Sequence, residues 1–275
     1  MRENVYVNCN KYYTILIFIT MLFEISDGKK CDIFVHIFNH LKHFTDSIVL
    51  TVSPEMLYIQ GMDSGHICVY ELMLQSDWFQ KWEVDNKQTY GISVPILNKI
   101  LRICSVNQTI IIHSDNDEDL QIDFTSEEKG VLNKYLKMPL MDIDTDHLHI
   151  PDTEYDVDIE MDSKKFKNLI DELSNFNETL NIDCDGEQLT FESSSGEGTM
   201  NVIITTDDVE LLAVVEDKEI KASYGIKYIS QMCQFYKLSS TCAIHITQDI
   251  PLQLKYVIDG DSIMRFYLAP KISND

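Results

Sequence analysis

Basic residues are scarce in this chain of 275 residues. Lysine and arginine number 22 against 45 aspartates and glutamates, which gives a formal net charge of -23. A uniformly acidic surface repels nucleic acid, because the phosphates carry the same sign. Any contact with DNA therefore needs a locally basic face. The hydrophobic share of 44% suffices for one large core or two cores of ordinary domain size.

Cysteine pairs and catalytic signatures are also missing. The seven cysteines are widely spaced and include no Cys-x-x-Cys pair, which argues against a disulfide framework and a zinc site and favours a reducing compartment. Phosphate-loop, zinc-protease and serine-hydrolase motifs do not occur. Asp142, Asp144 and Asp146 begin like a calcium loop, but His147 and Thr153 stand where glycine and glutamate are needed. We therefore expect no catalytic residue, no metal and no cofactor.

The longest apolar run, residues 12–23, follows Lys11 and resembles the hydrophobic part of a signal peptide. No small-x-small cleavage site follows it, and it is about half as long as the ~20 apolar residues of a membrane span. Met21 is a possible natural start, so residues 1–20 are interpreted as an N-terminal extension or a mis-assigned start. A secreted β-rich protein with sequons at Asn107 and Asn177 is the alternative.

The two halves of the chain resemble each other at a separation of about 130 residues. Four pairs of segments recur in the same order: 27–30 and 162–165, 109–113 and 241–245, 120–124 and 252–256, and 134–139 and 265–270. Such repetition predicts two domains of similar topology. We place them at 21–139 and 157–275, with a connecting loop at 140–156.

Each half shows two helical patterns among alternating segments. Helices are predicted near 31–44 and 95–105, and again near 163–175 and 226–236. In the first helix of each half, apolar residues recur at helical spacing: Phe34, Val35, Phe38 and Leu41, and Leu169, Ile170, Leu173 and Phe176. The remaining segments alternate as half-buried antiparallel strands do. The predicted fold class is α+β, with two helices on one face of antiparallel sheet, twice over.

The predicted exposed sides of these helices are neutral to basic. In 95–105 we place Ile96 and Leu97 on the apolar side, with Asn98, Lys99 and Arg102 opposite. The exposed sides of the other three helices contain histidine, lysine, asparagine and glutamine. For any single helix, a solvated face is the simpler interpretation. Recurrence over four helices favours contacts to phosphates, which bind without sequence preference and weaken with salt.

Several motifs together resemble the proliferating cell nuclear antigen family, the eukaryotic-type DNA sliding clamps. They are Met62-Asp-Ser-Gly-His66, Leu140-Met-Asp-Ile-Asp with Ile150-Pro151, Asp249-Ile-Pro251, and Tyr267-Leu-Ala-Pro-Lys-Ile272. The resemblance runs from about Met21 to the end of the chain. It implies a closed homotrimeric ring without enzymatic activity, in which helices line a hole for duplex DNA and sheets form the outside.

The resemblance implies two sets of site residues. The DNA-facing set is His36, Lys42, Lys99, Arg102, Lys164, Lys165, Lys167 and Lys227. Asn168, Asp171 and Gln234 occupy positions that are usually basic, so we expect weak, salt-sensitive DNA affinity. The partner-peptide pocket comprises Met62, Ile67, Val69, Leu148, Ile150, Tyr155, Ile250, Pro251, Tyr267, Ala269 and Pro270. Such a pocket accepts a peptide with one aliphatic and two aromatic anchors.

The resemblance also implies subunit contacts between residues near 132–138 of one chain and 198–205 of the next. In the family a turn of the second domain holds a lysine that is modified, but the matching turn, 184–189, contains no lysine. The resemblance therefore does not extend to modification at that place.

The function implied is that of a DNA polymerase processivity factor. Its partners are duplex DNA, polymerase and other proteins with clamp-binding peptides, a clamp loader and further copies of itself. The expected location is the nucleus, or a viral replication site if a virus encodes the chain. The alternatives are a clamp-like paralogue for damage signalling or viral transcription, and a monomeric processivity factor.

Overall fold

The computed structural model describes residues 20–116, 118–143, 148–185, 188–216 and 218–271. The first half of the chain contains β1 (Met21–Ile25), α1 (Gly28–Leu41), β2 (Ser47–Val52), β3 (Met56–Met62), β4 (Cys68–Gln75), the short 3-10 helix η1 (Ser76–Trp78), β5 (Lys81–Val84), β6 (Gln88–Ser93), α2 (Val94–Leu101), β7 (Thr109–Ser114), β8 (Asp119–Thr125) and β9 (Lys134–Pro139).

The second half repeats this order. It contains β10 (Val157–Asp162), α3 (Ser163–Leu173), β11 (Thr179–Cys184), β12 (Leu189–Ser195), β13 (Gly198–Ile204), β14 (Leu211–Val214), β15 (Ile220–Gly225), α4 (Ile226–Cys233), β16 (Thr241–Ile246), β17 (Leu252–Asp259) and β18 (Ser262–Leu268). The predicted α+β class, with two similar domains of two helices each, is confirmed.

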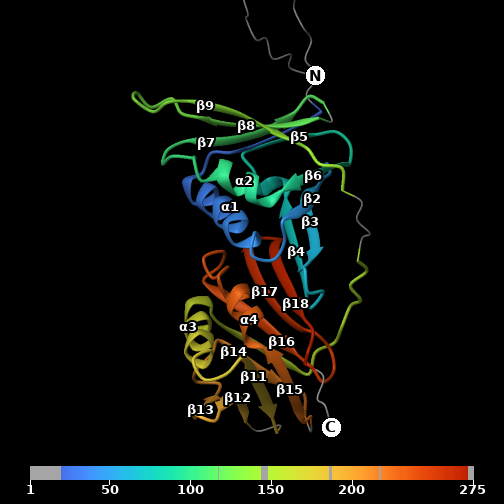
Figure 1. Cartoon of the computed structure of the whole chain (residues 1–275), viewed down its shortest axis with the longest axis vertical. Helices are drawn as coiled ribbons and strands as arrows, with labels where there is room; N and C mark the ends of the chain where they lie inside the picture. Colours follow the sequence, from blue (N-terminus) through green and yellow to red (C-terminus); the bar gives the residue numbers. More distant parts are fainter. Residues whose placement is uncertain (1–19, 117, 144–147, 186–187, 217, 272–275) are drawn as a thin grey trace, which may run out of the picture.

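The strands form three antiparallel sheets, and the central one joins both halves. Its order is β14-β10-β16-β17-β18-β4-β3-β2-β6, so β18 of the second half pairs directly with β4 of the first. A five-stranded sheet, β5-β1-β7-β8-β9, belongs to the first half, and a four-stranded sheet, β13-β12-β11-β15, belongs to the second. The four helices lie on one side of the molecule and the segment that connects the halves lies on the other (Figure 1).

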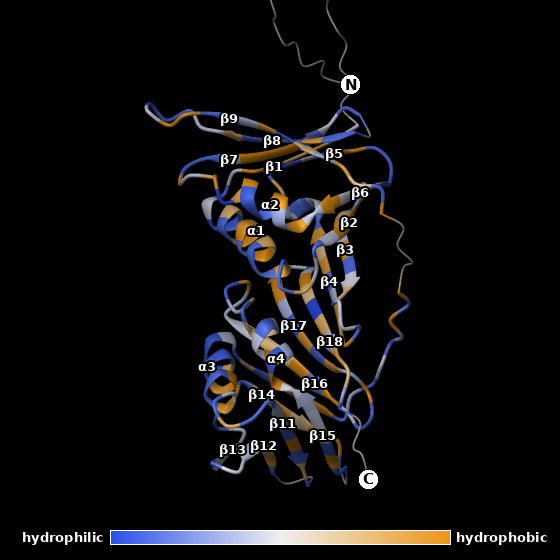
Figure 2. Cartoon of the chain, viewed as in Figure 1, coloured by the Kyte–Doolittle hydropathy of each residue, from blue (hydrophilic) through white to orange (hydrophobic). Residues whose placement is uncertain are grey.

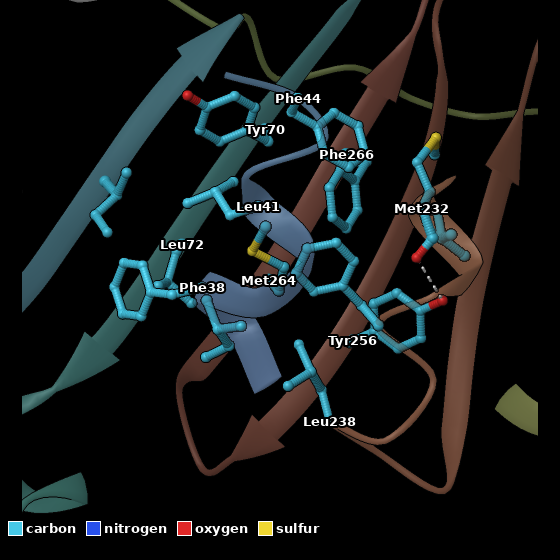
Figure 3. Close-up of a cluster of buried hydrophobic side chains, with 14 of the residues drawn as sticks. Phe38, Leu41, Phe44, Tyr70, Leu72, Met232, Leu238, Tyr256, Met264 and Phe266 are labelled. Carbon is cyan, nitrogen blue, oxygen red and sulfur yellow. Dashed lines mark hydrogen bonds between the residues drawn. The ribbon is translucent and has the colours of Figure 1, made fainter. Parts of the chain in front are cut away.

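One hydrophobic core continues across the joint between the halves. Phe38, Phe44 and Tyr70 come from the first half, and Tyr256 and Phe266 from the second (Figure 3). The Phe44 and Phe266 rings lie 5.3 Å apart, and both lie close to Phe235. Burial of such rings is the main stabilising term of a joint between domains. Hydrophilic residues remain on each of the four helices (Figure 2).

Aspartate caps begin the first helix of each half. The Lys30 backbone N–H donates to Asp27 Oδ1 at 2.9 Å, and the Lys165 N–H donates to Asp162 Oδ1 at 2.7 Å. This bond satisfies one of the free N–H groups of a helix N-terminus. It explains the recurrence of Asp-x-Lys-Lys in the sequence. It also explains why α1 covers Gly28–Leu41 instead of the predicted 31–44.

The structure corrects the alignment of the last strands by one residue. Leu120 pairs with Met138, and its counterpart Leu252 pairs with Leu268. Met138 therefore corresponds to Leu268, whereas alignment on the prolines matched it with Ala269. In a strand, a shift of one residue turns every side chain to the opposite face. Met138 and Leu268 are both fully buried, as equivalent positions should be.

Two helical faces also differ from expectation. The helix α2 starts at Val94, and its buried residues are Val94, Leu97, Asn98, Ile100 and Leu101, whereas Ile96 is 44% exposed. The predicted places of Asn98 and Ile96 are therefore exchanged. Phe176 lies beyond the end of α3 and is 37% exposed, although we expected it on the buried side of a helix.

The segments around the domains are described in part. Residues 1–19 lie outside the described residues, so the interpretation of 1–20 as an extension stays a prediction. The Thr20 backbone N–H donates to the Ser114 carbonyl at 2.8 Å. Between the halves, Met141 forms a β-bridge with Gly91, and a Cβ added to Gly91 would lie 2.0 Å from the Met141 carbonyl oxygen. No helix in the described part of the chain is long and apolar enough to span a bilayer.

Candidate functional site

The helical side of the molecule carries all eight residues predicted to face DNA (Figure 1). Each lies on a helix or at its C-cap. His36, Lys42 and Lys167 are half-buried, and the other five are exposed: Lys99, Arg102, Lys164, Lys165 and Lys227. The two helices of each domain thus present their basic residues on one side of the chain.

Some of these cations already have partners. Lys165 Nζ donates to the Asp208 carbonyl at 2.5 Å, and Lys167 Nζ forms an ion pair with the Asp171 carboxylate at 2.5 Å. Lys99, Lys164, Arg102 and Lys227 form no ion pair with another described residue. Their charges can therefore bind groups outside the chain, phosphates among them.

The histidines of α1 add little positive charge at neutral pH. His36 Nε2 lies 2.9 Å from the Gln234 carbonyl, and its ring centroid lies 4.4 Å from that of His40. Burial lowers the pKa of His36, although the Gln234 carbonyl opposes this shift. Burial and the neighbouring His36, His43 and Lys42 lower the pKa of His40 to about 4. Both imidazoles are therefore mainly neutral at pH 7.

A groove along α1 contains further cations that the sequence analysis missed. Its volume is about 700 Å³, and it is lined by Lys29, Asp32, Ile33, Val35, His36, Asn39, Arg102 and Lys237. Lys237 follows the predicted end of the fourth helix by one residue, so helical spacing gave no reason to include it. Lys29 belongs to the repeated Asp-x-Lys-Lys segment, which we used only as a sign of repetition. The groove combines charge from both halves of the chain.

Three predicted pocket residues form a row across the outer face of the central sheet. Met62 on β3 lies opposite Val69 on β4, and Val69 lies opposite Tyr267 on β18. Directly opposed residues of neighbouring strands share one face. Their neighbours Tyr70 and Phe266 point to the other face and are buried. The joint between the halves therefore builds the floor of the predicted pocket.

A buried aspartate shapes the turn between β3 and β4. The Asp63 carboxylate accepts hydrogen bonds from the backbone N–H groups of Gly65, Ile67 and Cys68 at 2.6–2.8 Å. The turn also places His66 in the left-handed region, at φ 56°. The Ile67 carbonyl then accepts a bond from the Ala269 N–H at 3.0 Å. Two predicted pocket residues from different domains are thereby held side by side.

The connecting segment is fastened to β3 by one amide side chain. Gln60 Nε2 donates to the Leu148 carbonyl, and the Leu148 N–H donates to Gln60 Oε1, each at 2.9 Å. Farther along, the Tyr155 ring lies 5.4 Å from the His245 ring. The sequence gave no signal for Gln60, because its partner depends on the path of a segment without regular structure. Asp63 could have been found, since an aspartate two residues before glycine is a turn signal.

The eleven predicted pocket residues are all at least partly exposed, so they do not belong to the core. Ile250 and Pro251 lie between β16 and β17, next to Asp249 at φ 60°. Ala269 and Pro270 follow β18. Burial raises the pKa of Tyr155 to about 12 and also raises that of Tyr267. Both hydroxyls therefore stay protonated at neutral pH and can donate to a peptide carbonyl.

Comparison with known proteins identifies the family. Residues 23–147 match the model of the N-terminal domain of proliferating cell nuclear antigen, and residues 149–271 match that of its C-terminal domain. The "Proliferating cell nuclear antigen" of Chaetomium thermophilum is 30% identical over 223 residues, covering 79% of this chain and 86% of the relative. The chain belongs to the proliferating cell nuclear antigen family.

Further relatives of this clamp family agree. "Proliferating cell nuclear antigen 1" of Plasmodium falciparum is 28% identical over 258 residues, covering 87% of this chain and 93% of the relative. The crystal structure of the Entamoeba histolytica antigen superimposes with a TM-score of 0.82 at 19% identity, covering 93% of this chain and 100% of that one. A PCNA2-PCNA3 complex of Sulfolobus tokodaii gives 0.81 at 20% identity, covering 91% and 99%. At these identities the solved structures show the fold alone.

Membership makes this chain a sliding clamp of the processivity-factor type, and the family consists of non-enzymatic scaffolds. In the described part of the chain, no group of three His, Cys, Asp or Glu side chains is arranged to hold a metal ion. The roles of individual DNA-facing and pocket residues stay predictions that the geometry accommodates.

Proposed function

We propose that the protein is a homotrimeric sliding clamp that encircles duplex DNA and raises the processivity of a DNA polymerase. Polymerase and other replication and repair proteins bind through short peptides to the pocket around Tyr267, and a clamp loader opens the ring. The sites of action are the nucleus or, for a virus-encoded chain, a viral replication site.

The observation that carries the proposal concerns the pairing of two strands inside the chain. The two strands that correspond to this pair by the internal repeat are edge strands, each unpaired along one side in the described part of the chain. β18 pairs with β4, and this joins a five-stranded unit of one half to a four-stranded unit of the other. By the internal repeat, β9 corresponds to β18 and β13 corresponds to β4. Both β9 and β13 are edge strands. Unpaired edges of this kind invite pairing with another chain, and equivalent head-to-tail joints close into a ring when the rotation allows.

Exposed apolar residues near the two edge strands correspond to buried apolar residues at the joint inside the chain. Phe44 and Phe176 each donate a backbone N–H to the last residue of the preceding helix, Leu41 or Leu173. Phe44 is 3% exposed and Phe176 is 37% exposed. The residue after each C-cap behaves likewise, since Phe235 is fully buried and its counterpart Ile103 is 43% exposed. A second copy of the chain would cover both exposed residues.

The repeat also gives the register of the proposed subunit contact. Phe266 pairs with Tyr70 in the chain. Ile122 and Leu254 are equivalent in the repeat. Ile122 pairs with Leu136 and Leu254 pairs with Phe266, so Leu136 corresponds to Phe266. Gly61 and Ser193 are equivalent as well. Gly61 pairs with Tyr70 and Ser193 pairs with Met200, so Met200 corresponds to Tyr70. Leu136 of one subunit should therefore lie opposite Met200 of the next.

Cysteine cross-linking tests this register. A chain with Leu136→Cys and Met200→Cys should give covalent dimers and trimers on mild oxidation, since directly opposed strand residues are close enough for a disulfide. The matched control is Leu136→Cys with Asn201→Cys, in which the second cysteine points to the opposite face. The unsubstituted chain controls for native thiols, because Cys104 is only partly buried.

Light scattering of the unsubstituted protein gives the second measurement. A trimeric mass with cross-links specific to the 136–200 pair supports the ring. A monomeric mass at micromolar concentration would contradict it, and a monomer that still lengthened polymerase products on primed circular DNA would favour a monomeric processivity factor. A trimer without any gain in product length would leave the clamp function unsupported.

A further inference from the structure

Polar contacts accompany the aromatic core at the joint between the halves. His36 on α1 reaches the carbonyl of Gln234, the C-cap of α4, at 2.9 Å. Lys30 Nζ donates to the Trp78 carbonyl at 2.9 Å and lies 3.5 Å from the Asp259 carboxylate of the β17–β18 hairpin. The His36–Gln234 and Lys30–Asp259 contacts join the first helix of one half to the second half. The corresponding residues of the open edges can be identified from the repeat.

The counterparts of His36 and Gln234 are oppositely charged. Asp171 follows the N-cap Asp162 at the same spacing as His36 follows the N-cap Asp27. Arg102 is the C-cap of α2, as Gln234 is of α4. In the proposed ring, Asp171 of one subunit would thus lie against the C-terminus of α2 of the next. A carboxylate is unfavourable beside that end of a helix dipole unless cations accompany it. Lys167 of the same chain already lies 2.5 Å from the Asp171 carboxylate, and Arg102 would supply a second cation across the contact.

The counterparts of Lys30 and Asp259 repeat their charges. Lys165 donates to the Asp208 carbonyl at 2.5 Å, much as Lys30 donates to that of Trp78. Glu127 matches Asp259 in sequence spacing, because each follows the equivalent residue, Leu120 or Leu252, by seven positions; Glu127 lies just beyond the end of β8. Glu127 is exposed, and it has no ion pair with another described residue.

We infer that two ion pairs close the contact between subunits, Arg102 with Asp171 of the next subunit and Lys165 with Glu127 of the preceding one. This inference rests on the proposed trimer. Each contacting face supplies one cation and one anion, and head-to-tail contact in the register of the repeat brings opposite charges together. At the matching places, the joint inside the chain has one ion pair, Lys30 with Asp259, a mainly neutral histidine in place of the second, and large aromatic rings. Salt should therefore weaken the contact between subunits more than the joint within the chain.

Charge exchange in the full-length protein tests the first pair. Arg102→Asp should raise the midpoint concentration of trimer dissociation about tenfold or more, since each contact loses an attraction and gains a repulsion. Asp171→Arg should do the same. The double variant should recover most of the loss, because the pair is restored with reversed charges. Sedimentation velocity without DNA, from 50 to 500 mM NaCl, measures the effect.

Lys87→Asp is the matched control. It makes the same change of charge on an exposed residue between β5 and β6, and β5 is the edge of its sheet opposite to β9. Circular dichroism establishes that each variant folds. A trimer that responds to Arg102→Asp no more than to Lys87→Asp, or a double variant no better than the singles, would overturn the ion pair and leave the trimer standing. A wild-type protein that is monomeric at every salt concentration would remove the proposed trimer itself.

Discussion

Tyr267 is the residue on which we expect the proposed partner site to depend most. It lies opposite Val69 at the joint between the domains, and it is half-buried on the outer face of the central sheet. Aromatic side chains at such places bury a large area against a partner at low entropic cost. Its aromatic ring, more than its hydroxyl, should therefore determine peptide affinity.

Replacement of Tyr267 by Ala should weaken binding of a peptide with one aliphatic and two aromatic anchors by about 10- to 100-fold, or about 1–3 kcal/mol. Isothermal titration or fluorescence anisotropy measures the change. Tyr267→Phe is the matched control and should stay within about threefold of wild type. Unchanged affinity of the alanine variant would show that the peptide does not use this wall.

Single residues also mark where the sequence was insufficient. Asn98 was expected outside and is 6% exposed, because α2 begins at Val94, at the end of β6. Periodicity alone does not fix the rotation of a helix of two turns. The proline match misaligned Met138 and Leu268 for a similar reason, since strand register is set by the ladder of neighbouring strands. In contrast, the Asp27 and Asp162 caps recur visibly because their contact is local.

Among the connecting elements, the turn between β3 and β4 is fixed by a buried side chain, that of Asp63. Its N–H groups converge on one carboxylate that is 7% exposed. A buried carboxylate that accepts several backbone bonds fixes the geometry of a loop. Through Ile67 and Ala269, the same turn is attached to the end of β18. Damage to it should therefore affect stability and the pocket together.

Asp63→Ala should lower the free energy of unfolding by about 2–4 kcal/mol, because buried N–H groups lose their acceptor. Asp63→Asn retains one side-chain oxygen and should cost about half as much. Urea unfolding followed by tryptophan fluorescence measures both. Equal stability of the alanine variant and wild type would mean that water replaces the carboxylate without loss.

At the scale of the elements, the repeat was the most reliable sequence signal. It predicted two domains of similar topology, and the periodicity within each half predicted two helices and antiparallel strands; both predictions are confirmed. It did not reveal the joint between β18 and β4, since pairing between distant strands leaves no local pattern. The pocket floor at Met62, Val69 and Tyr267 could therefore be placed from family resemblance but not from periodicity.

For the whole molecule, the balance between a strong negative charge and a few free cations should determine the strength of the proposed DNA binding. Forty-five acidic residues face 22 basic ones, and Lys167 and Lys165 are already engaged by neighbours. The histidines of α1 remain mainly neutral at pH 7 because burial lowers their pKa values. The remaining attraction should be weak and carried by few contacts.

DNA affinity of the assembled protein should therefore fall with salt, with a log–log slope of about -2 to -4, as expected for a few phosphate contacts. Lys99→Gln and Lys227→Gln should each reduce the magnitude of this slope by about 1. Lys87→Gln, on a loop away from the helices, is the control. Fluorescence anisotropy with closed and linear duplexes measures the DNA affinity at each salt concentration. An affinity that does not change between low and physiological salt would contradict phosphate contacts.

The joint between β18 and β4 has a mechanical consequence. It combines a continuous sheet, a shared aromatic core and a connecting segment fastened by Gln60 and by the Met141–Gly91 bridge. The two halves should then move together as one rigid body. In a ring assembled from such subunits, the contacts between chains are the most deformable part, so a force on the ring should change the geometry of these contacts first.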